Sequence, residues 1–259
     1  MYYLTRFILN DYLFIKLKYF LRHKKNPNLK NPQSFNERIA FFKLNSKSSF
    51  YTMLADKYRV KDYVIDKIGQ EYVLKNLYVT SNPSSIKFEK LPDSFIIKAT
   101  HGSSSNIIIR DKNKIDKASI IRQCNHFLSM NYYYWGREFH ARDITPRIII
   151  EELMLDSNGR VPFDYKFFTF NGRVKVIQVD IDRMKKHKRN FYDPDWNKIP
   201  VQFNHPNYNE VIKKPEKLIE MIDVANKLSN NLEFARIDLY CHLNKIYFGE
   251  ITLTPENNL

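Results

Sequence analysis

The sequence predicts an α+β fold in which antiparallel sheets follow a helical N-terminal region. Pairs of apolar stretches that flank short polar turns recur along the chain, and single amphipathic helical patterns lie between these pairs. A short turn joins antiparallel strands, whereas a doubly wound parallel sheet needs a crossover connection between its strands. The chain of 259 residues is long enough for one large domain or two small ones.

The N-terminal part of the chain shows helical patterns and helix-end signals. Residues 1–24 form a basic amphipathic pattern, which suits a helix on a membrane surface or, as the more common case, a helix packed on its own domain. Ser34 and Glu37 form a capping-box pattern at the start of a second helix. A third helix is expected over Ser48–Ile68, and Gly69 is its stop signal.

After Pro83 the spacing of the apolar residues changes from that of helices to that of strands. Phe95–Ala99 and Asn106–Arg110 are expected to pair as a hairpin. An amphipathic helix is expected over Lys117–Met130, and a strand over Arg147–Leu155.

The C-terminal half contains two further hairpins with a helix between them. Phe167–Phe170 and Val174–Asp180 flank an Asn-Gly pair, a strong signal for a two-residue hairpin turn. Pro215 is expected to open a helix, because the first turn tolerates proline. Glu233–Tyr240 and Lys245–Thr252 are expected to form the last hairpin.

The last hairpin carries a pattern of charged residues that predicts a metal site. Arg236 and Asp238 share one face of the first strand, and Glu250 and Thr252 share one face of the second. A turn centred on Asn244 would place Asp238 opposite Glu250, and like charges in that position destabilise a ladder unless a cation lies between them. Carboxylate oxygens are what Mg²⁺ prefers. The alternative is a register shifted by one residue, which turns one carboxylate to the other face.

A phosphate-binding role is one interpretation of the segment that follows Phe95. Lys98 ends the expected strand, and Gly102 and three serines follow it. A lysine beside a loop of small residues can hold phosphate through its charge and through backbone N–H groups. An ordinary hairpin turn is the alternative, and no Gly-Lys-Ser/Thr follows as a Walker A loop would require.

Two adjacent carboxylates, Glu151 and Glu152, end another apolar strand. A carboxylate at that place could accept a hydrogen bond from an adenine amino group, and the backbone after it could pair with the edge of the base. A salt-bridged sheet end explains the same pattern equally well.

Together these motifs resemble, in order and spacing, those of ATP-grasp ligases, and most closely the TupA-like ATP-grasp family of surface-polysaccharide biosynthesis. The resemblance extends over roughly residues 34–255 and is carried by seven segments in order: FNERIAFFKLN, LADKYRVKDYV, LPDSFIIKATHGS, DYKFFTFNG, IQVDIDR, KRNFYDPDW and ARIDLY with KIYFGEITLTP.

The resemblance implies an ATP-grasp fold that binds ATP and Mg²⁺. It implies a helical region over 1–75, a small lid subdomain over 76–155 and a larger, metal-bearing subdomain over 156–259. The residues implied to bind the nucleotide are Lys61, Lys98, Gly102, Ser103, Ser104, Ser105, Glu151, Glu152, Leu153 and Lys166. The implied catalytic residues are Lys98, Lys166 and Arg236, and the implied metal ligands are Asp238, Glu250 and Thr252.

The resemblance also implies the reaction. ATP would phosphorylate a carboxylate, and an amine would displace the acyl phosphate to give an amide. The partners would be an acidic sugar or glycan and an amino acid or amine, in capsule or O-antigen synthesis. Asp180, Arg183 and Arg189 are the candidate acceptor-binding residues. Serines stand where the family loop usually has a glycine. Thr252 stands where ATP-grasp enzymes commonly have Asn, and TupA-like relatives share this threonine.

The net charge of +14 points to anionic partners and leaves other classes of protein open. A nucleic-acid-binding protein would use the basic stretch 183–192, but no known nucleic-acid motif is present. A glycosyltransferase of the same pathway would need a nucleotide-sugar site, which the pattern does not show. The two cysteines are far apart in the chain and are expected to be reduced thiols, and the N-terminus is not a convincing signal peptide. Both observations predict a cytoplasmic protein. The alternative placement of residues 1–24 would add a peripheral contact with the inner face of the membrane.

Overall fold

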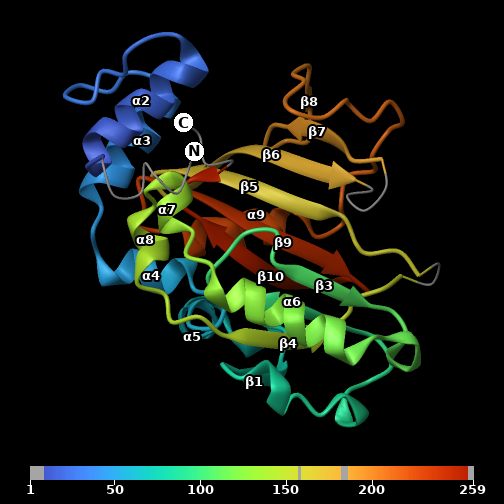
Figure 1. Cartoon of the computed structure of the whole chain (residues 1–259). Coiled ribbons are helices and arrows are strands. Elements are labelled where there is room, and N and C mark those ends of the chain that lie inside the picture. Colours follow the sequence, from blue (N-terminus) through green and yellow to red (C-terminus); the bar gives the residue numbers. More distant parts are fainter. Residues whose placement is uncertain (1–8, 157–158, 182–185, 256–259) are drawn as a thin grey trace.

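The computed structural model describes residues 9–156, 159–181 and 186–255. Two antiparallel sheets form the body of the protein, and helices cover one face of each (Figure 1). The predicted α+β class with antiparallel sheets is therefore confirmed. No helix in the described part of the chain has the length and the apolar character that crossing a bilayer requires.

The smaller sheet has four strands in the order β1-β4-β2-β3. Its strands are β1 (Asn76–Thr80), β2 (Phe95–Ala99), β3 (Asn106–Ile109) and β4 (Ile148–Glu152). The predicted β2–β3 hairpin is present, whereas β1 was not predicted. Helix α6 (Lys117–Ser129) covers one face, where its Ile120 and Cys124 join a core with Ile97 and Ile150. The opposite face of the sheet is left free of α6.

The larger sheet has six strands in the order β10-β9-β5-β6-β7-β8. Its strands are β5 (Asp164–Phe170), β6 (Arg173–Ile181), β7 (Lys188–Tyr192), β8 (Lys198–Ile199), β9 (Phe234–His242) and β10 (Lys245–Thr252). Helix α9 (Leu218–Leu228) packs on one face against a core that includes Phe167, Ile177 and Ile237. The helix begins three residues after Pro215, whose carbonyl accepts from the Leu218 N–H. Strands β7 and β8 were not predicted.

The N-terminal helices lie to one side of the sheets (Figure 1). Helix α2 (Asp11–His23) is capped by Asn10, and α3 (Phe35–Asn45) begins with the predicted capping box of Ser34 and Glu37. The remaining short elements are α7 (Tyr133–Gly136), α8 (Phe139–Arg142), η1 (Gln70–Tyr72), η2 (Pro83–Ser85), η3 (Phe88–Lys90) and η4 (Lys112–Lys114).

The single helix predicted over Ser48–Ile68 is wrong: the structure has two, α4 (Ser49–Ala55) and α5 (Val60–Ile68). The cause is the buried Asp56, whose carboxylate accepts from the Tyr58 N–H at 2.9 Å and thereby competes with the helical ladder. The break has a consequence for the site, because it directs Lys57 toward the sheets.

A β-bulge fixes the register of the β9–β10 hairpin. The turn consists of Leu243 and Asn244, both with positive φ, and the strands pair regularly from there to Phe248. The register then shifts by one residue, and Glu250 pairs with Asp238 as predicted. A Cβ on Gly249 would lie 2.9 Å from the Tyr240 ring and 3.0 Å from the Asp238 carbonyl oxygen, so only glycine fits.

Candidate active site

The face of the large sheet that α9 leaves free carries a continuous row of charged and polar side chains. Strand pairing aligns them across five strands, because residues opposite each other in register share a face. The row contains Glu250 and Thr252 on β10, Arg236 and Asp238 on β9, Asp164 and Lys166 on β5, Gln178 and Asp180 on β6, and Arg189 on β7. Most of these side chains are buried, so they must neutralise one another or a ligand.

Asp238 lies at the centre of this row. Arg236 donates two hydrogen bonds to its carboxylate, at 2.7 and 2.8 Å, and Lys166 donates one at 2.7 Å. Lys166 also donates to Asp164, which lies on the same strand. Burial raises the pKa of Asp238 against the opposing effect of Arg236 and Lys166, and the nearby carboxylates of Asp164 and Glu250 add to the rise.

Glu250 lies beside Asp238 on the same face and is more open to solvent. Arg236 donates to its Oε1 at 2.9 Å, and the Thr252 hydroxyl donates to the same oxygen at 3.0 Å. The other carboxylate oxygen, Oε2, faces the Lys57 ammonium at 3.7 Å. Burial acts to raise the pKa of Glu250, but Lys57 and Arg236 outweigh it and hold that pKa well below its usual range.

The donor set of this corner suits a magnesium ion. Asp238 and Glu250 lie on one face, as the metal hypothesis requires, and the Thr252 hydroxyl adds a third oxygen. The Arg236 guanidinium bridges the two carboxylates, which is the arrangement of a structural ion pair as well. In the described residues no group of three or more His, Cys, Asp or Glu side chains is arranged for a metal, so a cation here would need ligands from its substrate too.

The free face of the small sheet carries a second charged cluster. The Glu151 carboxylate on β4 accepts from Lys98 of β2 at 2.6 Å and forms an ion pair with Lys61 of α5. Lys61 also donates to the Leu74 carbonyl at 2.7 Å and to Asn76 Oδ1 at 2.5 Å. Burial acts to raise the pKa of Glu151, but Lys98 and Lys61 outweigh it, and the pKa is lowered. Burial lowers the pKa of Lys61 despite its pairing with Glu151.

The loop between β2 and β3 is held by a tyrosine. The Tyr132 hydroxyl donates to the Ser103 carbonyl at 2.7 Å and lies 2.6 Å from the Ser105 hydroxyl. A Cβ on Gly102 would lie 2.2 Å from the Tyr132 ring, so the close approach requires glycine. Ser104 adopts a positive φ of 57° at the tip. The loop thus has the backbone shape of a sharp turn, and its Ser104 side chain is exposed.

Lys57 connects the two sheets. Its ammonium donates to the Gly102 carbonyl at 2.5 Å and lies 3.7 Å from Glu250. Its own N–H donates to the Thr100 carbonyl at 3.0 Å. Lys61 was predicted as a site residue in this segment and Lys57 was not. A continuous helix would have placed the two lysines on the same face, whereas the break between α4 and α5 separates them and directs Lys57 to Gly102 and Glu250. The signal that could have found it is Asp56, a helix-interrupting residue directly before it.

The remaining predicted residues lie at the edges of the two clusters. Glu152 is exposed at the end of β4, and Leu153 is half-buried just after it. Arg189 is buried and donates to Asp180 at 2.7 Å, so both candidate acceptor residues are already paired with each other. Arg189 outweighs the effect of burial on Asp180, whose pKa is lowered. Arg183 lies outside the described residues.

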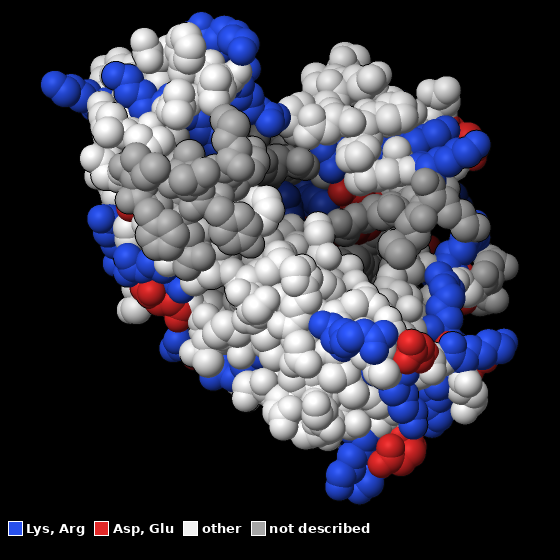
Figure 2. Space-filling view, in the orientation of Figure 1, with Lys and Arg blue, Asp and Glu red and all other residues white. Residues whose placement is uncertain are grey.

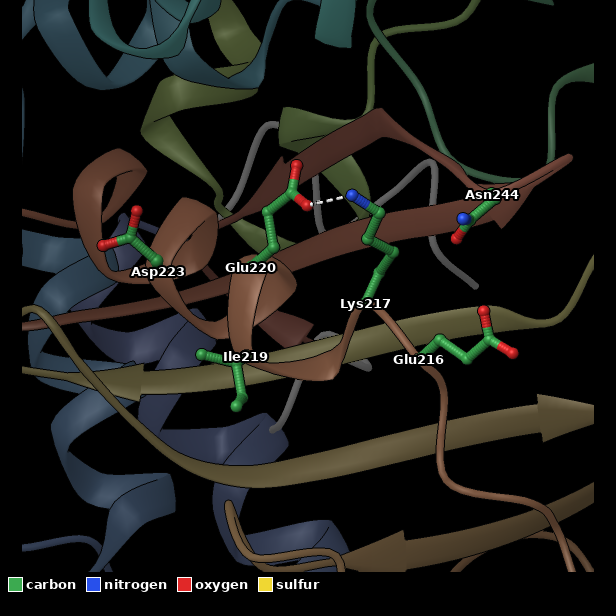
Figure 3. A pocket seen from close by; sticks show the side chains of 6 residues that line it. All are labelled: Glu216, Lys217, Ile219, Glu220, Asp223 and Asn244. Carbon is green, nitrogen blue, oxygen red and sulfur yellow. Dashed lines mark hydrogen bonds and ion pairs between the residues drawn. The ribbon is translucent and has the colours of Figure 1, made fainter.

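The space-filling view shows where these clusters reach the surface. Figure 2 shows a hollow over the region of β5 and β9, with blue and red side chains on its floor. A second, shallow pocket lies on the opposite face of the large sheet, beside α9 (Figure 3). Its lining includes Lys217, Glu220 and Asn244. None of the predicted site residues lines that pocket.

Comparison with known families identifies the class of this protein. The model of the TupA-like ATP-grasp family matches residues 37–259. The chain therefore belongs to the TupA-like ATP-grasp family, and the prediction made from the motifs is confirmed. No curated protein sequence matches the chain.

Several solved ATP-grasp structures are similar to this chain at low identity. The ATP-grasp ligase PsnB complexed with a minimal precursor is 11% identical, with a TM-score of 0.45, over 80% of this chain and 54% of PsnB. D-Alanine–D-alanine ligase from Bacillus anthracis is 16% identical, with a TM-score of 0.44, over 78% of this chain and 57% of the ligase. The ADP complex of purK, N5-carboxyaminoimidazole ribonucleotide synthetase, is 12% identical, with a TM-score of 0.49, over 80% of this chain and 46% of the synthetase. The chain spans about half the length of these proteins.

Proposed function

We propose that the protein is an ATP- and Mg²⁺-dependent carboxylate–amine ligase. The observation that carries the proposal is the pair of charged clusters on the free faces of the two sheets, joined by Lys57. One cluster has two lysines and one carboxylate, and the other has paired carboxylates beside an arginine and a lysine. A triphosphate needs the first kind of site and its metal ion needs the second.

In this proposal Lys61 and Lys98 bind the phosphates of ATP. Their ammonium groups are held by Glu151, which fixes their positions before the nucleotide enters. Lys61 donates to Leu74, Asn76 and Glu151 in the structure, so it would turn one of these three N–H groups to the phosphates. The loop from Gly102 to Ser105 would close over the phosphates with its backbone N–H groups and hydroxyls. Glu151 would also accept from the adenine amino group, using the lone pairs that the two lysines leave. Glu152 would lie next to the adenine base, and the backbone near Leu153 would pair with the edge of this base.

Asp238, Glu250 and Thr252 would hold Mg²⁺. The ion would neutralise phosphate charge and stabilise the transferring phosphoryl group. Arg236, which bridges the two carboxylates in the structure, would turn one of its N–H groups to the phosphates when a cation takes its place between them. Lys166 would favour the charged form of Asp238 and donate to phosphate oxygen. We assign catalytic roles to Lys98, Lys166 and Arg236, because each would hold phosphate oxygen in this proposal.

The reaction would join a carboxylate to an amine through an acyl phosphate. The carboxylate oxygen attacks the terminal phosphorus of ATP, ADP leaves, and the amine then displaces phosphate to give the amide. Water must be excluded while the acyl phosphate exists. The closing loop and the lid subdomain that we place at 76–155, over a larger subdomain at 156–259, would provide that exclusion.

We further propose an acidic sugar or glycan as the carboxylate substrate and an amino acid or another amine as the nucleophile, in capsular or O-antigen polysaccharide synthesis. Asp180, Arg183 and Arg189 are the acceptor-binding candidates, and the Asp180–Arg189 pair lies on the same sheet face as the metal candidates. A reaction that consumes ATP would take place in the cytoplasm, where cysteines such as Cys124 and Cys241 stay reduced. We expect no specific nucleic-acid partner.

The test combines binding and turnover. ATP with Mg²⁺ should stabilise the wild-type protein against unfolding by about 2.7 kcal/mol at a hundredfold excess over the dissociation constant. Lys98→Ala should remove most of this gain, whereas the exposed Lys90→Ala should keep it. Uronic acid sugars and amino acids, added with ATP and Mg²⁺, should release ADP and give a new amide by mass spectrometry. Tight, salt-sensitive DNA binding without ADP release would support the nucleic-acid alternative instead.

A further inference from the structure

Helix α2 is apolar on two opposite sides. Phe14, Ile15 and Tyr19 are buried against Leu29 and Ala40 and form a small core of their own. This inward side accounts for the attachment of α2 to the protein. A helix with one partner needs one apolar face only, and further apolar residues on the outside indicate a second partner.

The outward side of α2 carries four large apolar side chains. Leu13, Leu17, Phe20 and Leu21 are 48, 47, 43 and 53% exposed. Their spacing of four, three and one residues places them on one stripe of the helix. Isolated exposed leucines are ordinary, but a stripe of four is a contiguous apolar patch of the kind that marks an interaction surface.

Basic residues are concentrated at the C-terminal end of this stripe. Between Asp11 and Glu37 the chain has no acidic residue and six lysines and arginines: Lys16, Lys18, Arg22, Lys24, Lys25 and Lys30. Lys18 donates to the Trp135 carbonyl and so belongs to the inward side. Arg22, Lys24 and Lys25 are exposed where the helix ends. Figure 2 shows blue side chains around white ones at the end of the molecule where α2 lies in Figure 1.

We propose that the outward face of α2 docks on an anionic lipid surface. The apolar stripe enters the boundary between headgroups and acyl chains, and the flanking cations lie at the level of the phosphates. Each lysine or arginine close to such a surface adds to the attraction, which falls off within a Debye length.

Charge favours lipid over a second copy of this chain. A symmetric contact between two α2 helices would place the acid-free stretch 12–36 of one copy beside the same stretch of the other. Those cations would repel one another, and Asp11, the carboxylate of α2, is already engaged by Arg137 and Tyr133. A phosphate-rich surface has the complementary charge.

The test is vesicle flotation of the full chain. Wild type should float with vesicles of phosphatidylcholine mixed with phosphatidylglycerol and should not float with phosphatidylcholine alone. Leu17→Ser with Phe20→Ser should abolish flotation, and Lys24→Glu with Lys25→Glu should weaken binding by about tenfold or more. All four positions are exposed, so circular dichroism and melting temperature should match wild type.

The matched control is Val211→Ser with Ile219→Ser, which removes two apolar side chains that are 95 and 80% exposed elsewhere. This control should float like wild type. The proposal is overturned if wild type ignores the anionic vesicles, or if the control and the α2 variant lose flotation equally. It is also overturned if light scattering shows a dimer that Leu17→Ser with Phe20→Ser converts to a monomer, since a second copy then covers the stripe.

Discussion

The two charged clusters differ in the sign of their excess charge. The cluster of the small sheet has two ammonium groups, Lys61 and Lys98, around the single carboxylate of Glu151. The row on the large sheet has the opposite excess near Asp238, where the three carboxylates of Asp164, Asp238 and Glu250 share Lys166 and Arg236. A cationic excess attracts phosphate and an anionic excess attracts a metal ion, so the two faces suit two different parts of one Mg²⁺–ATP complex.

Lys57 modifies this comparison because it belongs to both regions. It holds the Gly102 carbonyl on the small-sheet side and adds a positive charge beside Glu250 on the other. Because the Lys57 ammonium contacts a group from each region, the loss of this cation should affect both.

The largest effect is expected where one carboxylate holds two partly buried cations. Glu151→Ala should lower the free energy of unfolding by about 3 kcal/mol, because Lys61 and Lys98 lose their common partner. Urea unfolding measures this. The neighbouring Glu152→Ala is the matched control, since Glu152 is exposed and should cost little. Equal effects of the two substitutions would show that the cluster is not held together by Glu151.

On the large sheet we expect loss of one carboxylate charge to reduce activity far more than stability. Glu250→Gln keeps an acceptor for Arg236 but removes the charge that Lys57 and Arg236 stabilise, so the free energy of unfolding should fall, though by less than at Glu151 because Glu250 is only half-buried. ADP release should fall by about a hundredfold or more, because a metal ligand is lost. Glu233→Gln, at an exposed ion pair with Arg38, is the control for the chemical change. Lost stability with near-normal turnover would assign Glu250 to a structural ion pair.

Lys57→Met should have an intermediate effect. The substitution removes a charge-assisted hydrogen bond to Gly102 and the ion pair with Glu250, and a loss of about 1.5 kcal/mol in the free energy of unfolding is expected. The exposed Lys90→Met should change nothing. If Lys57→Met were as stable as wild type, the link between the two sheets would have no energetic role.

The pH dependence of stability should have opposite signs at Glu151 and Asp238. The pKa of Glu151 is lowered on folding, so its contribution is present above the ordinary value near 4.5 and is lost as the pH falls through the folded value. The pKa of Asp238 is raised, so the folded state binds the proton more tightly and gains relative stability as the pH falls.

Unfolding of wild type, Glu151→Gln and Asp238→Asn between pH 3 and pH 7 tests this, since about this range contains the ordinary pKa of a carboxyl group. The stability difference between wild type and Glu151→Gln should shrink toward low pH. The difference between wild type and Asp238→Asn should change in the opposite direction. If both stability differences changed with pH in the same direction, the neighbouring cations would determine the pKa shift of both carboxylates, and burial would not raise the pKa of Asp238.

Local signals in the sequence were sufficient for much of this protein. The capping box at Ser34, the Asn-Gly turn and the alternating strands of the last hairpin each act over a few residues, and each is present in the structure. The seven ordered motifs were sufficient for the family. These features could be predicted because the residues that cause them are neighbours in the chain.

Other features depended on contacts between distant residues. The pairing of Asp238 with Glu250 was predicted, but the bulge at Gly249 produces it, and that bulge depends on how closely the backbone approaches Tyr240. The joining of Lys61 and Lys98 at Glu151 needs three separate elements to meet.

The break between α4 and α5 shows the same limit most clearly. In the sequence the helical spacing of apolar residues continues through Asp56. In the structure α4 ends just before Asp56, because the buried Asp56 carboxylate accepts from the Tyr58 N–H and the Lys57 N–H donates to the Thr100 carbonyl. The sequence by itself determined the family, the types of most elements and the residues that could carry charge. Only the tertiary structure decided which charges meet, because that depends on strand register and on backbone contacts between segments far apart in the chain.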